Sequence, residues 1–265
     1  MNIWTTKSIE LASQSNYLDL LYKVYPMSIN LRREIDKNTQ GSIKNYLEMG
    51  DKKNLILTLL DQEVFPIKDS YVAYLKRDRT AIDRNPNTID RLFGILVEMG
   101  FEEIIDKATL PKETNRQIGP LFKRWVNTGA LGAEITENAS HFLNSKGNII
   151  FNSSDKAMSE FAKEFLGYNH DKGLDFIAKF NDTYIIAETK FLTDFGGHQN
   201  AQFNDAISTM KSQFRQMDKQ VKAISILDGV LYIKGNHKMM KSLYSFDNDD
   251  VVISSVLLRD YLYQL

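Results

Sequence analysis

Residues Gly173–Phe191 read GLDFIAKFNDTYIIAETKF and consist of two β-rich runs on either side of Asn181-Asp182. Asparagine and aspartate both tolerate the left-handed backbone that a two-residue hairpin turn requires. With these residues in the turn, Phe180 pairs with Thr183, and each step outward along one strand fixes the partner on the other. The stretch therefore predicts a β-hairpin in one defined register.

This register brings two acids and an amine together. Counting outward from the turn places Asp175 directly opposite Glu188, and paired positions share a face of the sheet with Cβ atoms about 4.5–5.5 Å apart. Lys190 lies two residues beyond Glu188 and points to the same face, whereas Thr189 points away. Because facing like charges destabilise a hairpin, a cation between the two acids would offset that cost.

The pair of acids suits a hard divalent cation. Mg²⁺ commonly binds one or two carboxylates, keeps several waters and takes up phosphate oxygens of a substrate. The backbone carbonyl of Ala187 is a further candidate ligand. Such an ion lowers the pKa of its bound water and polarises a phosphoryl oxygen, while Lys190 can orient the water and stabilise negative charge. The arrangement predicts metal-assisted hydrolysis of a phosphodiester.

An alternative is a plain ion pair between Lys190 and one acid at a strand edge, which contributes about 0–1 kcal/mol when exposed. Short acid-x-lysine patterns also occur by chance. Two observations favour the metal site: the ETK of residues 188–190 is the only Glu-x-Lys in the chain, and it ends an apolar strand. The comparable DKK of residues 51–53 lies in a polar segment without a strand.

The character of the chain changes near residue 130. Residues 1–130 are expected to form a mostly helical region, and residues 131–265 a core of strands and helices around the hairpin. The helical segments expected in the first part are 15–25, ended by Pro26, then 53–65 and 87–100, with Gly100 as a C-terminal stop. The second part is expected to begin with a helix within 153–167, capped by Ser154, followed by the hairpin. A helix with an apolar stripe from Phe203 to Met217 comes next. One strand or a tight pair is then expected at 221–233 around Asp228-Gly229, and a strand running into a helix at the C-terminus.

Composition excludes several classes of protein. The 265 residues include no cysteine, which excludes disulfides and thiolate metal sites, and four scattered histidines make a histidine-ligated zinc unlikely on spacing alone. No run of about 18 apolar residues and no signal-peptide pattern is present, so a cytoplasmic protein without membrane contact is expected. The net charge of −1 argues against a protein that coats nucleic acid through bulk positive charge.

The GLDF of residues 173–176 and the ETK of residues 188–190 resemble the motif of the PD-(D/E)xK nuclease superfamily, with Leu174 in place of the proline. The order helix, strand, strand, helix, strand from about Ser140 is similar to that superfamily's core. Chain length and the helical first half resemble a type II restriction endonuclease, which implies that residues 1–130 contribute to DNA recognition and dimerisation and that residues 131–265 form the catalytic core. The resemblance implies a restriction-endonuclease-like α/β fold with a mixed central sheet flanked by helices.

The same resemblance implies roles for individual residues. Asp175 and Glu188 would be metal ligands, and Lys190 would be the catalytic lysine. A further acid on the preceding helix would join the metal site, which points to Glu160 or Glu164, one helical turn apart. The alternative for these two glutamates is a solvated helix face.

Two polar segments are candidates for DNA contact. In PKETNRQ, residues 111–117, arginine can bridge guanine, and asparagine or glutamine can bridge adenine, while nearby basic residues can neutralise phosphates. The alternative is an interhelical loop in which Thr114 and Gln117 form a capping box. The candidates in and after this segment are Lys112, Thr114, Asn115, Arg116, Gln117, Lys123 and Arg124.

The second segment, TDFGGHQNAQ, follows the catalytic strand and opens the Phe203 helix. Its glycines permit close backbone approach, and N–H groups at a helix N-terminus bind phosphate readily. We interpret His198 as a DNA contact rather than a general base, because the metal already activates water. The candidates are His198, Gln199, Asn200 and Gln202.

These observations predict a site-specific endonuclease that hydrolyses double-stranded DNA with Mg²⁺, for which Mn²⁺ is a substitute. The resemblance further implies a homodimer that faces both strands of a palindrome, and a cognate DNA methyltransferase that acts in the same system without being a physical partner. Two alternatives remain open: a nuclease of DNA repair or defence without fixed sequence specificity, and a DNA-binding protein without catalysis.

Overall fold

The computed structural model describes residues 1–14, 16–26, 32–111, 117–216 and 218–265. The chain forms two compact units: Met1–Met27 together with Glu113–Leu265, and Ser28–Lys112. This division differs from the boundary expected near residue 130. The first residues of the chain belong with the sheet, and the helical unit is inserted between two segments of the other unit.

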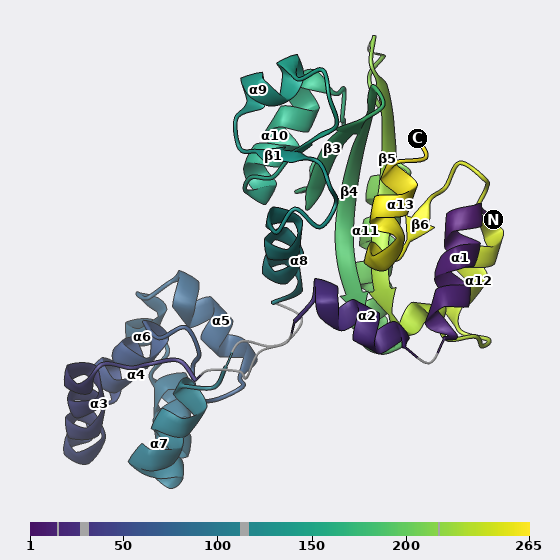
Figure 1. Cartoon of the computed structure of the whole chain (residues 1–265). Coiled ribbons are helices and arrows are strands. Elements are labelled where there is room, and N and C mark those ends of the chain that lie inside the picture. Colours follow the sequence, from purple (N-terminus) through teal and green to yellow (C-terminus); the bar gives the residue numbers. More distant parts are fainter. Residues whose placement is uncertain (15, 27–31, 112–116, 217) are drawn as a thin grey trace. The chain divides into compact units, whose positions relative to one another are not determined.

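The helical unit is built around one small core. Leu55, Ile56 and Leu59 are fully buried and pack with Leu92 and Leu96. Its helices are α3 (Lys37–Met49), α4 (Lys52–Leu60), α5 (Ser70–Arg77), α6 (Ala81–Arg84) and α7 (Pro86–Ala108) (Figure 1). The predicted stop at Gly100 is a kink instead: its φ of 71° breaks the helix, and the chain resumes a helical path afterwards.

The other unit contains a mixed sheet of six strands in the order β1-β2-β3-β4-β5-β6. Pairing is antiparallel for β2/β3 and β3/β4 and parallel for β1/β2, β4/β5 and β5/β6. The strands are β1 (Glu134–Thr136), β2 (Ile149–Phe151), β3 (Phe176–Phe180), β4 (Thr183–Leu192), β5 (Gln220–Gly229) and β6 (Val252–Ile253). The sheet and its flanking helices confirm the predicted α/β class, although the short β1 and β2 were not foreseen.

The hairpin forms in the predicted register. Asn181 and Asp182 make the turn with φ values of 45° and 65°, and Phe180 pairs with Thr183. The pairing continues to Phe176 opposite Ala187, so the next pair outward is Asp175 and Glu188. Nearly every residue of β4 is buried, as expected for a strand with neighbours on both sides and helices on both faces.

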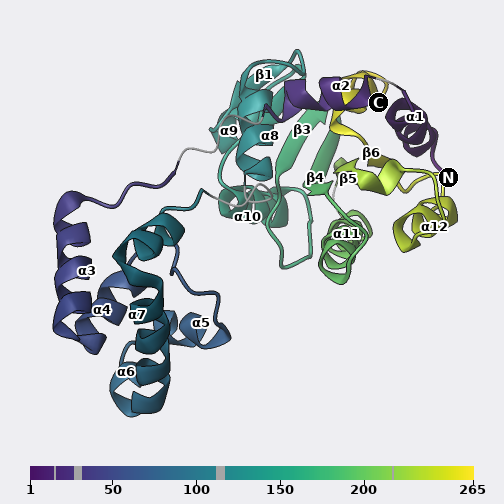
Figure 2. The same ribbon diagram turned by 90° about the horizontal axis from the view of Figure 1, so that it is seen from below.

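Helices cover both faces of this sheet (Figure 2). On one face, α10 packs on a core that includes Ile177 and Ile186, and α11 packs on β4 and β5. On the other face, the α8 side chain of Phe122 contacts Phe176, and α2 packs beside α8. The helices of this unit are α1 (Ile3–Ala12), α2 (Tyr17–Val24), α8 (Ile118–Asn127), α9 (Ala139–Asn144), α10 (Asp155–Phe165), α11 (Gly197–Met210), α12 (Lys238–Ser245) and α13 (Leu258–Leu262).

Several sequence expectations need adjustment. Ser154 caps α10 as predicted, accepting from the Ala157 N–H at 3.2 Å. The apolar stripe expected to reach Met217, which lies outside the described residues, gives a helix that ends at Met210. Phe214 instead forms an isolated β-bridge with Tyr168. Asp228-Gly229 is not a hairpin turn but the end of the single strand β5.

The buried carboxylate of Asp228 connects the N-terminal helices to the sheet through hydrogen bonds. Asp228 is fully buried, and its carboxylate accepts hydrogen bonds from the Tyr25 hydroxyl at 2.9 Å and the Ser255 N–H at 3.2 Å. Burial raises the pKa of Asp228, while these donors oppose the shift. In addition, the Thr5 hydroxyl donates to the Val252 carbonyl at 2.9 Å. Helices α1 and α2 are therefore integral to the sheet-containing unit.

Across the described ranges of the chain, the structure contains no helix with the length and hydrophobicity needed to span a bilayer.

Candidate active site

A cavity of about 390 Å³ opens where β4 runs past the start of β3. Its walls come from β4, from the first residues of α8 and from α11. The residues that line it are Ile118, Gly119, Asp175, Thr189, Lys190, Phe191, His198, Gln202 and Asp205. Two of the three predicted catalytic side chains, those of Asp175 and Lys190, therefore reach one cavity.

Glu188 does not line this cavity, but it contacts Lys190, which does, and each of its carboxylate oxygens has a partner. Its side chain is buried, and Oε1 is 2.7 Å from Nζ of Lys190. Oε2 accepts a hydrogen bond of 2.7 Å from the hydroxyl of Thr209, which is fully buried. These contacts hold Glu188 in one orientation, since each oxygen has a different donor.

Asp175 is held by the backbone of the opposite strand. The Thr189 N–H donates to Oδ2 of Asp175 at 2.7 Å, and the Asp175 N–H donates to the Ala187 carbonyl at 3.0 Å. Burial raises the pKa of Asp175 to about 6, although the charge of Lys190 and the Thr189 N–H both act in the opposite direction. The negative charge of Glu188 adds to the increase, as expected for two acids on one face of a hairpin.

Lys190 remains a cation in this setting. Burial lowers its pKa, but the ion pair with Glu188 and the charges of Asp175 and Asp205 outweigh that effect, so its pKa is raised. The ion pair between Lys190 and Glu188 differs from the exposed strand-edge pair considered as the alternative, because Glu188 is buried. The metal-site interpretation and the ion-pair interpretation both include this contact.

The donor set suits Mg²⁺ better than a transition metal. The described residues contain no group of three or more histidine, cysteine, aspartate or glutamate side chains able to hold a metal ion. Mg²⁺ needs only one or two carboxylates, because waters and phosphate oxygens complete its shell. Asp175 and Glu188 could supply these carboxylates, but the Glu188 oxygens already contact Lys190 and Thr209 and would have to share with a metal. The Ala187 carbonyl already accepts from the Asp175 N–H, so it would have to share its oxygen with a metal.

The acids predicted on the preceding helix lie elsewhere. Glu160 and Glu164 are both exposed on α10, and neither lines the cavity. Glu160 forms a loose pair with Lys156 at 3.8 Å. The first acid of that helix, Asp155, is the one whose charge raises the pKa of Asp175.

The chain matches the family model described as Tsp45I type II restriction enzyme over residues 2–265. The chain belongs to the Tsp45I type II restriction enzyme family. Neither the comparison with curated proteins nor the comparison with solved structures gave a match. Membership of this restriction-enzyme family confirms the predicted family and makes the protein a site-specific deoxyribonuclease whose substrate is double-stranded DNA.

In this restriction enzyme, one polar face of α11 completes the site. His198, Gln202, Asp205 and Thr209 are spaced i, i+4, i+7 and i+11, which is one face of a helix. The first three line the cavity, and Thr209 bonds to Glu188. Asp205 also forms an ion pair with Lys172. Asp205 and Thr209 were not predicted, because the apolar stripe dominates the sequence pattern of this helix and these two residues lie on its polar face.

The first segment proposed for DNA contact lies mostly outside the described residues: Lys112, Thr114, Asn115 and Arg116. Gln117 directly precedes α8, which begins at Ile118, and the capping box with Thr114 falls on residues outside those described. The Lys123 side chain makes contacts within the protein: Nζ donates to the Ser153 carbonyl at 2.7 Å and forms an ion pair with Asp155. Arg124 is exposed on the same helix.

The second segment is divided between the cavity and the protein interior. His198 is exposed, and its Nε2 lies 3.1 Å from Nε2 of Gln202. Gln199 is buried, and its Oε1 accepts from the Thr193 N–H at 3.1 Å. Asn200 donates to the Phe195 carbonyl at 2.7 Å. These bonds favour a structural role for Gln199 and Asn200, while His198 and Gln202 face the cavity.

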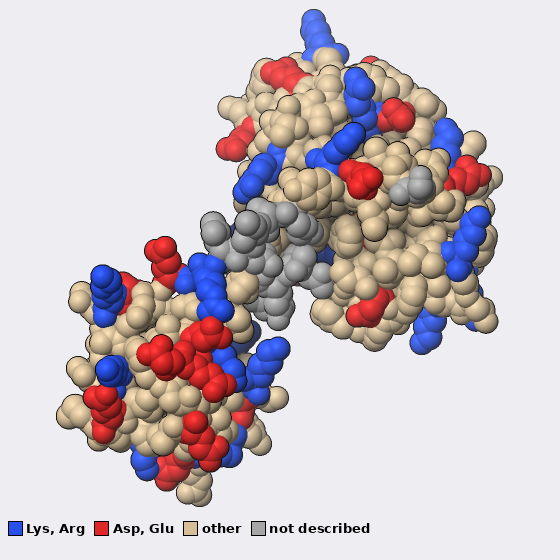
Figure 3. Space-filling model, turned by 60° about the horizontal axis from the view of Figure 1, so that its bottom comes forward, with Lys and Arg blue, Asp and Glu red and all other residues tan. Residues whose placement is uncertain are grey.

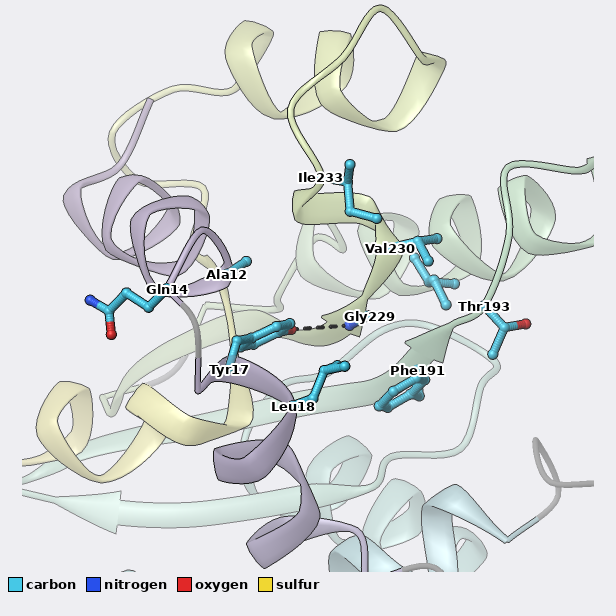
Figure 4. Close-up of a pocket in the computed structure, with 10 residues that line it drawn as sticks. Ala12, Gln14, Tyr17, Leu18, Phe191, Thr193, Gly229, Val230 and Ile233 are labelled. Carbon is cyan, nitrogen blue, oxygen red and sulfur yellow. Dashed lines mark hydrogen bonds between the residues drawn. The ribbon is translucent and has the colours of Figure 1, made fainter.

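A second cavity, of about 450 Å³, lies at the carboxyl ends of β4 and β5 and shares Phe191 with the first. In Figure 4, Leu18, Phe191, Val230 and Ile233 surround it, and the Tyr17 hydroxyl accepts from the Gly229 N–H at 3.2 Å. The described lining carries no charged side chain. This cavity is therefore unsuited to phosphoryl chemistry.

Charge on the surface is mixed. On the face of the helical unit that Figure 3 displays, lysine and arginine side chains alternate with aspartate and glutamate. Ion pairs within this unit include Arg91 with Asp69 at 2.6 Å and Lys53 with Asp83 at 2.6 Å. Such a surface agrees with a net charge of −1 and favours site-directed binding over bulk attraction to DNA.

Proposed function

We propose that this restriction endonuclease hydrolyses DNA phosphodiesters with Mg²⁺ held by Asp175 and Glu188, and that Lys190 is the catalytic lysine. The single observation that supports this assignment most is the hairpin register: Phe176 pairs with Ala187, so the next position outward brings Asp175 across from Glu188, and Asp175 and Lys190 line one cavity. Mn²⁺ is the expected substitute ion. The further candidate ligands are the Ala187 carbonyl, which adjoins Asp175, and Glu160 or Glu164, which do not line the cavity.

Each residue has a defined task in this scheme. Mg²⁺, when bound, supplies a water of lowered pKa and polarises the phosphoryl oxygen. Asp175, held by the Thr189 N–H, presents a carboxylate to the cavity in a fixed orientation. Lys190, kept protonated by Glu188, orients the attacking water and stabilises the charge that develops on the phosphate.

Digestion of a DNA of known sequence tests the proposal as a whole. We expect discrete fragments that require Mg²⁺, and sequencing of their ends gives the recognition site and the cut position. Fragments produced equally well with a chelator present would contradict the metal assignment. A smear without fixed ends would favour a nuclease of repair or defence, and persistent inactivity on diverse DNA would favour a binding protein.

The proposal extends to assembly and setting. A homodimer would place two cavities on the two strands of a palindromic site. A cognate DNA methyltransferase would protect the same site in the host without binding the nuclease, in the cytoplasm of the cell. Light scattering of the free protein and of its DNA complex tests the dimer, since a single chain on each duplex would contradict it.

Removing the Lys190 amine is expected to slow turnover more than it weakens binding. Lys190→Ala should lower kcat by roughly a hundred- to a thousandfold, the usual effect of losing one donor at a developing charge. Single-turnover cleavage and DNA binding are measured side by side. Lys222→Ala, at an exposed lysine of β5, is the matched control. An unchanged rate in Lys190→Ala would make the lysine a structural partner of Glu188.

Removing the Thr209 hydroxyl is expected to disturb Glu188 without opening a cavity. Thr209→Val should lower kcat roughly ten- to a hundredfold, because a hydrogen bond to a charged group contributes about 1.5–3 kcal/mol. Thr209→Ser keeps the donor and should restore most of the activity. A higher Mg²⁺ concentration needed for activity in Thr209→Val but not in Thr209→Ser would show that the Thr209 hydroxyl positions Glu188. An equal loss of activity in both variants would indicate a packing defect.

A further inference from the structure

The cavity has a second wall with polar groups that the proposed reaction does not use. Thr189 and Lys190 are successive residues of β4, so their side chains point to opposite faces of the sheet. The face of Thr189 is the one covered by α8, since Phe122 of α8 contacts Phe176, which shares that face. The first two residues of α8, Ile118 and Gly119, line the cavity together with Thr189.

The start of α8 offers backbone donors. The first N–H groups of an α-helix have no carbonyl partner within the helix, and the side chain of Gln117 does not cap this one. Gly119 leaves the approach open, because a Cβ added there would meet nothing within 4 Å. An anion at this position would be stabilised by the N–H groups and by the helix dipole.

An independent observation points to a ligand at the same place. Thr189 is only 3% exposed, and its Oγ1 is buried without a hydrogen-bond partner in the described structure. A buried hydroxyl in this state costs free energy unless something binds to it. Thr189 lines the cavity; its Oγ1 has almost no accessible surface, so a rotation about χ1 would bring the hydroxyl to a ligand oxygen that enters there.

We infer that the Ile118 and Gly119 N–H groups and the Thr189 hydroxyl form a phosphate-binding subsite. Its ligand is the backbone phosphate adjacent to the scissile phosphate on the same DNA strand, since Thr189 and Lys190 line one cavity from opposite faces of β4. The inference rests on the proposed function, which places the scissile phosphate beside Asp175 and Lys190. It assigns to the beginning of α8 the task of fixing the strand in register for cleavage.

A charge placed at Gly119 tests the subsite with the fold preserved. Gly119→Asp puts a carboxylate where the phosphate binds, and an acid at a helix N-terminus does not weaken the helix. Gly119→Asn has the same shape without the charge. Binding of a duplex that carries the mapped site is measured by fluorescence anisotropy without divalent metal. We expect the aspartate variant to bind at least about tenfold more weakly than the asparagine variant.

The Thr189 hydroxyl is tested by a second pair of variants. Thr189→Val should raise the Kd for the same duplex severalfold, and Thr189→Ser should restore it. Both variants keep the backbone N–H that holds Asp175, so a loss confined to valine reports the hydroxyl. Equal binding by the valine and serine variants would remove Thr189 from the subsite.

The outcomes separate the subsite from the proposed function. Equal binding by the two Gly119 variants, with wild-type protein cutting and Asp175→Asn inactive, would overturn the subsite alone. Normal cutting by Asp175→Asn would instead overturn the proposed function. Inorganic phosphate is tested by its effect on the Gly119 amide resonance. A shift of the Gly119 amide resonance on addition of phosphate would show that the site binds an anion. If Gly119→Asp and Gly119→Asn also bound DNA equally, that anion would be free phosphate, and a role of the site in DNA binding would be contradicted.

Discussion

Replacement of Asp175 by asparagine is expected to abolish DNA cleavage while the protein still folds and binds DNA. Asparagine keeps the shape of the side chain and can still accept from the Thr189 N–H, but it removes the negative charge that a hard cation requires. Loss of a few kcal/mol of transition-state stabilisation corresponds to a rate lower by roughly a thousandfold or more. Cleavage of the mapped duplex under single-turnover conditions measures the effect.

Asp171→Asn is the matched control, because Asp171 is a fully exposed aspartate four residues away that pairs with Lys163 at 2.7 Å. It should cut at the wild-type rate. Near-normal cleavage by Asp175→Asn would exclude this residue from the metal site.

Asp175→Asn should not lower the free energy of unfolding, because the raised pKa of Asp175 means that its ionised carboxylate destabilises the folded state. Burial raises the pKa of Asp175 to about 6 from its ordinary value of 3.8, so the folded protein binds this proton more tightly than the unfolded chain. The ionised carboxylate therefore costs stability, and the cost develops as pH rises from about 4 through 6. Without metal at pH 7 to 8, Asp175→Asn should melt at the wild-type temperature or above it. A clearly lower Tm would contradict this account.

Replacement of Gly229 by alanine is expected to destabilise the sheet-containing unit severely. Gly229 has a φ of 97°, and a Cβ there would lie 2.1 Å from the Leu192 carbonyl oxygen. Backbone strain and overpacking each cost about 1–3 kcal/mol, so a loss of roughly 2–6 kcal/mol in the free energy of unfolding is expected. Leu192 ends the strand that carries Glu188 and Lys190, and any adjustment that relieves the clash displaces them.

Urea unfolding of the variant and of a glycine control measures this loss. Gly147→Ala serves as the control, since a Cβ at Gly147 meets nothing within 4 Å and its φ is not in the left-handed range. It should unfold within about 0.5 kcal/mol of the wild type, as surface substitutions commonly do. Similar midpoints for both alanine variants would show that the strand ends can separate without cost.

The hairpin could be predicted from sequence because its determinants are local. Two residues that accept positive φ fix the turn, the turn fixes the register, and the register fixes which side chains share a face. That chain of inference needed no information from beyond Gly173–Phe191. It led to Asp175, Glu188 and Lys190 before any tertiary contact was known.

The remainder of the site depends on contacts that the local pattern does not encode. Asp205 and Thr209 reach the cavity only because α11 packs on β4 with one particular face, and the apolar stripe of that helix drew attention away from its polar one. The start of α8 is brought to the catalytic strand by packing across the sheet. The pair Asp228-Gly229 suggested a turn from sequence. The burial of Asp228 could not be foreseen, because its partners Tyr25 and Ser255 come from distant parts of the chain.

The joining of the first residues of the chain to the last strands has a consequence during synthesis. The Thr5 hydroxyl meets Val252, and Tyr25 meets Asp228, so α1 and α2 emerge from the ribosome long before their partners exist. The inserted helical unit can fold in the meantime. An unfinished chain thus lacks the partners of α1 and α2 and has no complete sheet around the hairpin that leads to Asp175 and Glu188.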